Sequence, residues 1–334
     1  MMKKRIILLS MCILLTFFGC RPKTTTLSFV GDILLSRGVA SQIETKGVDY
    51  PFANVKEMFL EDSLTIGNLE GPLTENDQGV YKNRHIVFKA SPQLANTLEN
   101  NGLNLLTLAN NHSMDYGYQG LQDTIKALKE QGLDIMGTRG QQSNLHTFVG
   151  ENGMTFGFLG YTVFPPEGYI MSEKRTDVVY YNPQLVQYEI TEARKQCDYL
   201  IVEMHWGKEY DTYYSTSQEK VGRALIDSGA DVVMGHHPHV IQGIEKYKGK
   251  YIFYSIGNFI FDHQNYRYTD ESVVLQMVVE DEASIEWWAI PLIIDGCQPR
   301  KAKGETGQRI IDQWTERSNH TVNWIKQDDY WLLK

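Results

Sequence analysis

Basic residues are scarce in this sequence of 334 residues, which has 32 lysines and arginines against 41 aspartates and glutamates. Three of the basic residues, Lys3, Lys4 and Arg5, lie in an N-terminal leader, so the rest of the chain has 29 basic and 41 acidic residues and a net charge of −12. A surface this acidic repels phosphate backbones. We therefore expect no nucleic acid among the partners.

Cysteine is also rare, with four residues, and no two of them have Cys-x-x-Cys spacing. This excludes zinc knuckles and thioredoxin-like redox motifs. Cys12 and Cys20 belong to the leader region, which leaves Cys197 and Cys297 as the pair that could form a disulfide. Their separation in sequence does not fix their distance, so a disulfide and two buried free thiols both remain open.

Long apolar runs are absent except for Ile6 to Gly19, which is shorter than the about 20 residues that span a bilayer. This run follows the basic residues and ends in Gly19-Cys20, and it resembles a bacterial lipoprotein signal. We expect a signal peptide over 1–19, lipidation of Cys20 and a short tether over 20–26. The protein would then be anchored on the extracytoplasmic side of a membrane in the cell envelope. An uncleaved anchor and a plain secretory signal are the alternatives.

No repeat, low-complexity tract or flexible linker divides the remaining chain, which indicates one continuous domain. Short apolar runs ending in Gly, Asn, Asp or His alternate with helical patterns such as 119–131 and 217–228. This alternation predicts an α/β fold with a sheet core. We expect the main domain over 27–300, and a C-terminal helix and strap over 301–334 packed on it.

Two regions interrupt the alternation. A hairpin with an Asn-Gly turn is predicted at 145–161, and three further strands are predicted at 250–255, 272–280 and 284–294. We infer from them a second sheet, packed face to face on the first, with helices outside.

Polar residues follow several predicted strands, where open α/β sheets bind their ligands. Asp32 follows the first strand, with Arg37 shortly after it, and Glu70 lies at the tip of a loop shaped by neighbouring glycine and proline residues. Taken alone, Asp32 is more typical of a turn and helix cap, and Glu70 of a solvated loop residue. His112 is more informative, because Asp115 is close enough in sequence to orient its ring and raise its basicity.

Histidines gather at the same places, since five of the nine follow three predicted strand ends. They are His112, His205, His236, His237 and His239. The last two occupy alternate positions of an extended segment, so their rings point the same way. Imidazole mixed with carboxylate and amide oxygens is the donor set of borderline metals such as zinc and manganese. The pattern predicts a metal site; a hydrogen-bonded polar cluster is the alternative.

Asn258, after a later strand, is predicted to contact substrate or to close a turn.

Six of these motifs occur in the same order as in the CapA-type bacterial capsule synthesis proteins, which are associated with poly-γ-glutamate. The sequence resembles that family from about residue 27 to residue 261. The motifs are Gly31-Asp32 with Arg37, Asn68-Leu69-Glu70, Ala109-Asn110-Asn111-His112, His205-Trp206-Gly207, Gly235-His236-His237-Pro238-His239 and Gly257-Asn258-Phe259. That family is in turn similar to calcineurin-like metallophosphatases. The resemblance implies their fold, a two-sheet β-sandwich flanked by helices in four α/β/β/α layers.

The resemblance also implies a divalent metal, which would be manganese, zinc or iron in one or two sites. Its ligands would be Asp32, Glu70, Asn111, His205, His237 and His239. One position departs from the metallophosphatase pattern, which has a histidine two residues after the first aspartate. This sequence has Leu34 there. The first of two metal positions would therefore lack a ligand.

These features predict a metal-dependent hydrolase or transferase in the synthesis, export or anchoring of an anionic capsule polymer such as poly-γ-glutamate. His112, oriented by Asp115, would be the general acid, and Arg37 would bind a carboxylate or phosphate. Asn258 and His236 would contact substrate. The expected partners are the polymer, a membrane through the lipid anchor, and membrane subunits of a capsule synthesis complex. A non-catalytic assembly or anchoring subunit and a metallophosphoesterase are the alternatives.

Overall fold

The structure is a computed structural model that describes residues 23–139, 144–165, 168 and 177–334. The predicted signal peptide 1–19 and the lipidation site Cys20 lie outside the described residues. Within the described ranges, no helix is both long enough and apolar enough to cross a membrane.

The larger sheet has ten strands and mixes parallel and antiparallel pairs. Its parallel half consists of β1 (Thr25–Ile33), β2 (Leu64–Leu69), β3 (Leu105–Thr107), β4 (Asp134–Met136) and β13 (Asn258–Ile260). Its antiparallel half consists of β14 (Glu271–Asp281), β15 (Ser284–Asp295), β16 (Gln298–Lys301), β17 (Trp324–Gln327) and β18 (Tyr330–Leu333). The two halves join where β14 pairs with β1.

The second sheet has six strands in the order β11-β12-β10-β9-β7-β6. They are β6 (His146–Val149), β7 (Thr155–Thr162), β9 (Tyr199–His205), β10 (Val232–His236), β11 (Ile241–Tyr247) and β12 (Lys250–Ile256). A separate pair is formed by β5 (Thr138–Arg139) and β8 (Asp177–Val178). The hairpin predicted around the Asn-Gly turn is confirmed as β6 and β7, which pair antiparallel.

The helices lie outside the sheets. They are α1 (Arg37–Lys46), α2 (Leu94–Asn100), α3 (Gly117–Glu130), α4 (Pro183–Ala193), α5 (Thr216–Ser228) and α6 (Gly304–Arg317), with short 3-10 helices η1 (Tyr50–Phe52), η2 (Lys56–Met58) and η3 (Arg84–Ile86). The predicted helices at 119–131 and 217–228 correspond to α3 and α5. A capping box fixes the start of α5, because Ser215 accepts from the Gln218 backbone and the Gln218 side chain accepts from the Ser215 backbone.

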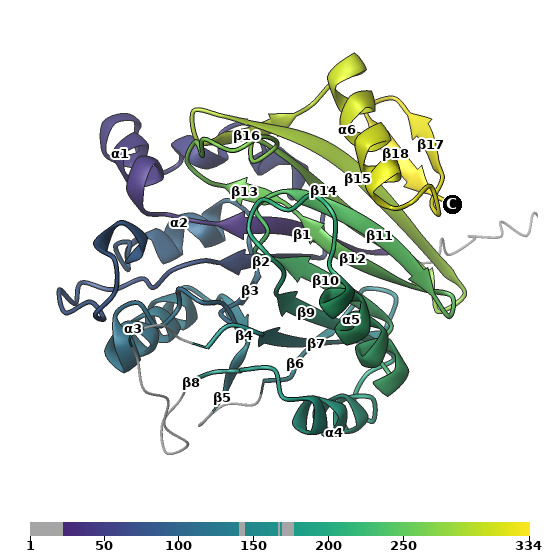
Figure 1. The fold of residues 1–334 in the computed structure, drawn as a ribbon, viewed down its shortest axis with the longest axis horizontal. Helices are drawn as coiled ribbons and strands as arrows, with labels where there is room; N and C mark the ends of the chain where they lie inside the picture. The colour runs from purple at the N-terminus through teal and green to yellow at the C-terminus, as the bar shows by residue number, and fades with distance from the viewer. Residues whose placement is uncertain (1–22, 140–143, 166–167, 169–176) are drawn as a thin grey trace, which may run out of the picture.

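Three apolar clusters define the layers. Phe29 and Ile66 of the larger sheet pack with Phe158, Ile201 and Met234 of the second sheet, so this cluster lies between the two sheets. A second cluster lies between the outer face of the larger sheet and α1, α2 and α3, and a third between the second sheet and α4 and α5. In Figure 1, α1, α2 and α3 lie on the left of the molecule, and α4 and α5 lie at the lower right. The predicted four-layer α/β/β/α sandwich is confirmed.

The division of strands between the sheets differs from the sequence prediction. The strands predicted at 272–280 and 284–294 as part of the second sheet are β14 and β15, and they extend the larger sheet from β1. The alternation of strands with helices predicts that the strands ending in His205 and His236 share a sheet with β1. In the structure, these two strands pair with each other in the second sheet. Hydrophobic pattern identifies a strand without identifying its neighbours, because pairing depends on contacts distant in sequence.

The C-terminal segment contributes both to the core between the sheets and to the larger sheet. Trp314 of α6 is fully buried in the core between the sheets, and its indole nitrogen donates to the Gln242 carbonyl at 2.8 Å. The residues after α6 form the hairpin of β17 and β18, and β18 pairs with β15.

Cys197 and Cys297 are both free and buried, which answers the question that their spacing left open.

Candidate functional site

The carboxyl ends of both sheets meet at one place. Asp32 and Asn68 end β1 and β2 of the larger sheet, and His205 ends β9 of the second. The Asn68 amide donates to Asp32 Oδ1 at 2.8 Å, and the same nitrogen lies 3.4 Å from His205 Nδ1. Asn68 therefore links the two sheets at the centre of the predicted site.

The predicted metal ligands converge around this link. Three overlapping sets have ligand atoms within 4.8 Å of one another: Asp32, Glu70 and His239; Glu70, His205 and His237; and Glu209, His237 and His239. Asn111 joins them, because its side-chain oxygen lies 2.8 Å from His205 Nε2. All six predicted ligands thus belong to one cluster.

The cluster fits a divalent cation. Glu70 is 1% exposed, and its Oε2 has no hydrogen-bond partner among the described residues. Burial raises the pKa of Glu70 to about 8, against the attraction of His239. A buried carboxylate that lacks enough countercharge is stabilised by a cation placed beside it. Carboxylate and imidazole together are the donors that zinc, manganese and iron accept.

Two of the histidines are held neutral. Burial lowers the pKa of His237 to about 3, helped by the charge of His239, and burial with the nearby His237 lowers the pKa of His205 well below its ordinary value. Since a metal binds the neutral ring, these two side chains need lose no proton on binding. His239 is different: burial lowers its pKa, but Glu70 and Asp32 outweigh burial and raise it to about 9.

Backbone strain is concentrated at the same histidines. His237 and His239 have φ of 97° and 59°, in the region that residues other than glycine seldom occupy. The backbone nitrogen of His237 donates to Asp32 Oδ2 at 3.2 Å, which holds this conformation. Strained backbone of this kind persists where the surrounding structure enforces it, and it is common at functional sites.

His112 lies beside the cluster, with Nε2 3.8 Å from Glu70 Oε1. Its Nδ1 is 3.0 Å from Asp115 Oδ2, so the predicted orienting contact with Asp115 is present. The ring stacks on Phe88 at 4.2 Å between centroids. Burial lowers the pKa of His112, although Asp115 acts in the opposite direction. The lowered pKa favours the neutral ring, and the contact with Asp115 favours the tautomer with its proton on Nδ1, which leaves Nε2 as the acceptor.

Asn110 holds the corner that carries His112. Its side-chain oxygen accepts from the backbone nitrogens of His112 at 3.0 Å and Ser113 at 2.9 Å. Its amide nitrogen donates to Asn68 Oδ1 and to the Leu69 carbonyl. The loop after β3 is thereby fixed to the end of β2, which sets the distance between His112 and Glu70.

His236 and Asn258, which are predicted to contact substrate, are both buried. His236 is 1% exposed, with Nε2 3.2 Å from Glu203 and Nδ1 3.5 Å from Asp32, and these carboxylates raise its pKa to about 10 against the effect of burial. Asn258 is fully buried, and its side-chain oxygen lies 2.9 Å from His239 Nδ1. His236 thus contacts Asp32, and Asn258 contacts His239, so both side chains can orient metal-ligand candidates.

Arg37 lies at the rim of the cluster with φ of 52°. Its guanidinium pairs with Asp262 at 2.5 Å and lies 4.8 Å from the Phe88 ring centroid, and its side chain is 31% exposed. It remains near enough to Glu70 to lower that carboxyl's pKa. An anionic ligand could reach this guanidinium from solvent.

Leu34 occupies the place where the metallophosphatase pattern has a ligand. It is fully buried and packs with Phe88 and Phe261. Leu34 therefore offers no donor to a metal at this position.

Two residues in the site escaped the sequence prediction. Lys82 has a side chain only 6% exposed, and its ammonium is 2.5 Å from Asp115 Oδ1. It comes from a polar loop with no pattern that points to a site, so nothing in the sequence identified it. Glu209 belongs to one of the three candidate ligand sets. The sequence could have identified Glu209 as a candidate ligand, because it is an acidic residue four positions after His205 and follows a glycine turn.

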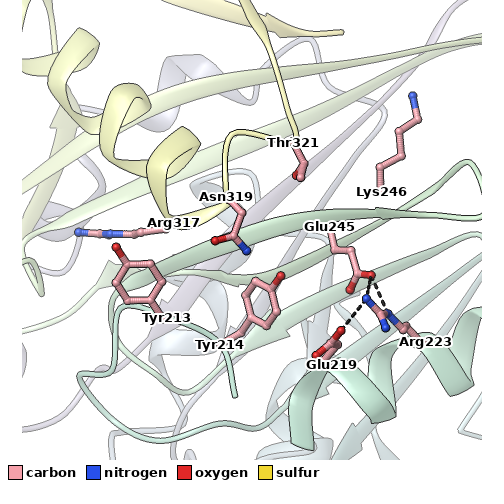
Figure 2. Close-up of a pocket in the computed structure, with 9 residues that line it drawn as sticks. All are labelled: Tyr213, Tyr214, Glu219, Arg223, Glu245, Lys246, Arg317, Asn319 and Thr321. Atoms are coloured by element: carbon pink, nitrogen blue, oxygen red, sulfur yellow. Dashed lines mark hydrogen bonds and ion pairs between the residues drawn. The ribbon is translucent and has the colours of Figure 1, made fainter. Parts of the chain in front are cut away.

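A separate cavity of about 430 Å³ lies away from these residues. Figure 2 shows its lining, where Arg223 pairs with Glu219 and Glu245. Tyr213 and Tyr214 form part of its wall. Among the described residues that line it there is no histidine or cysteine, so it lacks the imidazole donors of the histidine cluster.

Comparison with known proteins identifies related sequences. The sequence profile of the family described as "Bacterial capsule synthesis protein PGA_cap" matches residues 26–263. The "PGA biosynthesis protein CapA" of Bacillus subtilis is 34% identical over 297 residues, which cover 87% of this chain and 78% of that protein. The "Capsule biosynthesis protein CapA" of Bacillus anthracis is 33% identical over 318 residues, 92% of this chain and 77% of that protein. A "Probable polyglutamine synthesis accessory protein" of Mycobacterium tuberculosis is 30% identical over 239 residues, 65% of this chain and 61% of that protein.

Proposed function

Because the chain belongs to the bacterial capsule synthesis protein family, we propose that it acts in the synthesis, export or anchoring of an anionic capsule polymer such as poly-γ-glutamate. Its activity would be that of a metal-dependent hydrolase or transferase. One observation carries the catalytic part: His112, oriented by Asp115, presents Nε2 to a cluster of buried carboxylates and imidazoles. The unpaired Oε2 of Glu70 belongs to the same cluster and supports this role.

The cation would be held by Asp32, Glu70, Asn111, His205, His237 and His239. A bound divalent ion supplies a Lewis acid that polarises a carbonyl or phosphoryl oxygen and lowers the pKa of water toward neutrality. His236 and Asn258 support this set from behind, because they fix Asp32 and His239. Supporting contacts of this kind hold ligands in their binding orientation.

His112 is the residue that accepts and donates the proton in this reaction. Its neutral ring in the free protein makes it a proton acceptor first, where the sequence alone suggested a general acid. Nε2 takes a proton from the attacking water or acceptor group and returns it to the leaving group, which balances the transfer. Lys82 and Asp115 stay paired throughout, so Asp115 keeps orienting the ring.

Arg37 gives the site a positive group for a polyanion. The protein is acidic overall, so long-range electrostatics oppose the approach of such a polymer. Arg37 and the bound cation act at short range, where their attraction to one carboxylate is strongest. We propose that the polymer is recognised locally at this rim, one acidic group at a time.

The experiment replaces His112 with Asn in cells and measures surface polymer. We expect loss of polymer, with folding and metal content of the purified variant unchanged. His320→Asn is the matched control, because His320 is exposed at the end of α6 and has the positive φ that Asn tolerates. Assays with γ-glutamyl substrates and a panel of phosphoesters identify the bond that is cleaved.

A folded, metal-loaded His112→Asn protein that supports normal polymer levels would reject the catalytic proposal. The role of a non-catalytic assembly or anchoring subunit would then replace it. Activity confined to phosphoesters would instead identify a metallophosphoesterase.

A further inference from the structure

Glu209 is the solvent-facing member of the histidine cluster. Its carboxylate and the ligand nitrogens of His237 and His239 lie within 4.8 Å of one another. Glu209 is exposed, whereas both histidines are buried. Its charge also acts on the rest of the cluster, since it helps to raise the pKa values of Glu70 and His239. The carboxylate therefore faces the same space as the buried donors.

The turn after β9 fixes Glu209 in this place. Gly207 has φ of 88°, and a Cβ there would lie 2.7 Å from the Gln218 amide, so the turn requires glycine. The backbone nitrogen of Tyr210 donates to the Pro238 carbonyl at 2.8 Å. The Tyr210 ring stacks on Tyr266 with 3.7 Å between centroids. Glu209 is thus tied by its neighbour to Pro238, the residue between the two histidines.

This arrangement matches a known kind of metal coordination. Two histidines and one glutamate, with a remaining position for water or substrate, form the ligand set of catalytic zinc sites in several hydrolases. Leu34 is buried against Phe88 and Phe261 and offers no donor to the cluster. Glu209 would add a carboxylate donor to the two histidines from the solvent side.

We propose that Glu209 is a metal ligand, and that with His237 and His239 it forms the solvent-facing end of a zinc or manganese centre. The inference rests on the proposed function in one respect, because it requires that the histidine cluster bind an ion. A ligand on an exposed turn also explains how an ion reaches a site whose other donors are buried. An ion would enter at Glu209, and Glu70 and His239 would be among the buried residues that hold it.

The experiment measures Zn²⁺ and Mn²⁺ affinity of the purified full-length chain by competition with a chelator, and the visible spectrum after loading with Co²⁺. Glu209→Gln removes the charge and keeps the size. Asp211→Asn is the matched control, because Asp211 lies two residues away in the same turn and pairs with Lys208. Glu209→His replaces the oxygen donor with a nitrogen donor.

We expect Glu209→Gln to weaken Zn²⁺ binding by on the order of 10- to 100-fold, a loss of the size seen when metal-site partners are removed. The Co²⁺ spectrum should change with the altered ligand set. Asp211→Asn should bind like the parent protein, and Glu209→His should recover most of the affinity. Because Glu209 is exposed, the variants should keep the parent's melting temperature.

Equal affinity and equal Co²⁺ spectra for the parent and Glu209→Gln would overturn the inference and leave the proposed function standing. Equal weakening by Asp211→Asn would also overturn it, because the effect would then be one of surface charge. A parent protein that binds neither ion would overturn both the inference and the metal-dependent part of the proposed function.

Discussion

At the scale of single residues, burial assigns different protonation states to chemically similar groups. His205 and His237 are neutral because burial opposes their charge, whereas His239 keeps a proton because it faces Glu70 and Asp32. Glu70 itself is protonated more readily than an exposed glutamate. The cluster without a metal therefore carries protons on the groups that must release them for a metal to bind.

Metal binding should accordingly release protons and strengthen as pH rises. The pKa values of Glu70 and His239 are raised to about 8 and about 9, so this pair carries at least one proton at pH 7. Metal and protons compete for these ligands, so affinity should increase between pH 7 and pH 9. Ordinary imidazoles would place this change near pH 6. Calorimetry of Zn²⁺ binding in buffers of different ionisation enthalpy measures the released protons; a binding heat that is independent of buffer would contradict the prediction.

At the scale of elements, the position of Asp32 depends on close packing of the strand ends. The pairing of β1 with β2 and with β13 is irregular at Asp32, where the backbone nitrogen donates to the Gly257 carbonyl at 3.2 Å. Gly31 precedes this point, and a Cβ there would overlap with the Gly257 carbonyl oxygen. The sheet can approach this closely only without a side chain at residue 31.

Gly31→Ala should therefore destabilise the fold and displace Asp32 from the cluster. Overpacking against backbone costs about 1–3 kcal/mol or more, because backbone atoms cannot rotate away. We expect a lower melting temperature and weaker metal binding together. Gly153→Ala is the control: its Cβ would meet nothing within 4 Å, so it should cost only the backbone penalty of roughly 1–2 kcal/mol and leave metal binding unchanged. Unchanged metal binding in a folded Gly31→Ala protein would contradict this account.

At the scale of the whole molecule, the larger sheet contains both the first described strand, β1, and the last, β18. Trp314 of α6 enters the core between the sheets, and β18 extends the larger sheet. The site lies where the ends of the two sheets meet, and β1 begins at Thr25, only five residues after Cys20. A lipid on Cys20 would thus keep the domain close to the membrane surface.

Cys20→Ala should release the protein from membranes or stop its maturation. The reason is the basic leader, the apolar run and Gly19-Cys20, which together resemble a lipoprotein signal. Fractionation of cells and mass spectrometry of the mature N-terminus test this. A mature chain that begins anywhere other than at an acylated Cys20 would reject the lipoprotein proposal.

Local patterns in the sequence were enough to identify the candidate ligands and the fold class. Asp32, Glu70, His205 and His237 follow strands that their apolar patterns reveal, because the carboxyl ends of strands in α/β folds collect functional groups. Helices such as α3 followed from periodicity, since burial of one face repeats at helical spacing. The order of the motifs was sufficient to indicate the family.

How these residues are used depends on the folded chain. Which strands share a sheet depends on pairing between segments far apart in sequence, so the meeting of β1 with β9 could not be read from local patterns. Lys82 reaches Asp115 from a loop with no distinguishing sequence, and Asn258 contacts His239 across a long separation in sequence. Protonation of the cluster likewise depends on burial and on the charges that folding brings together, which are properties of the assembled site and not of any residue in it.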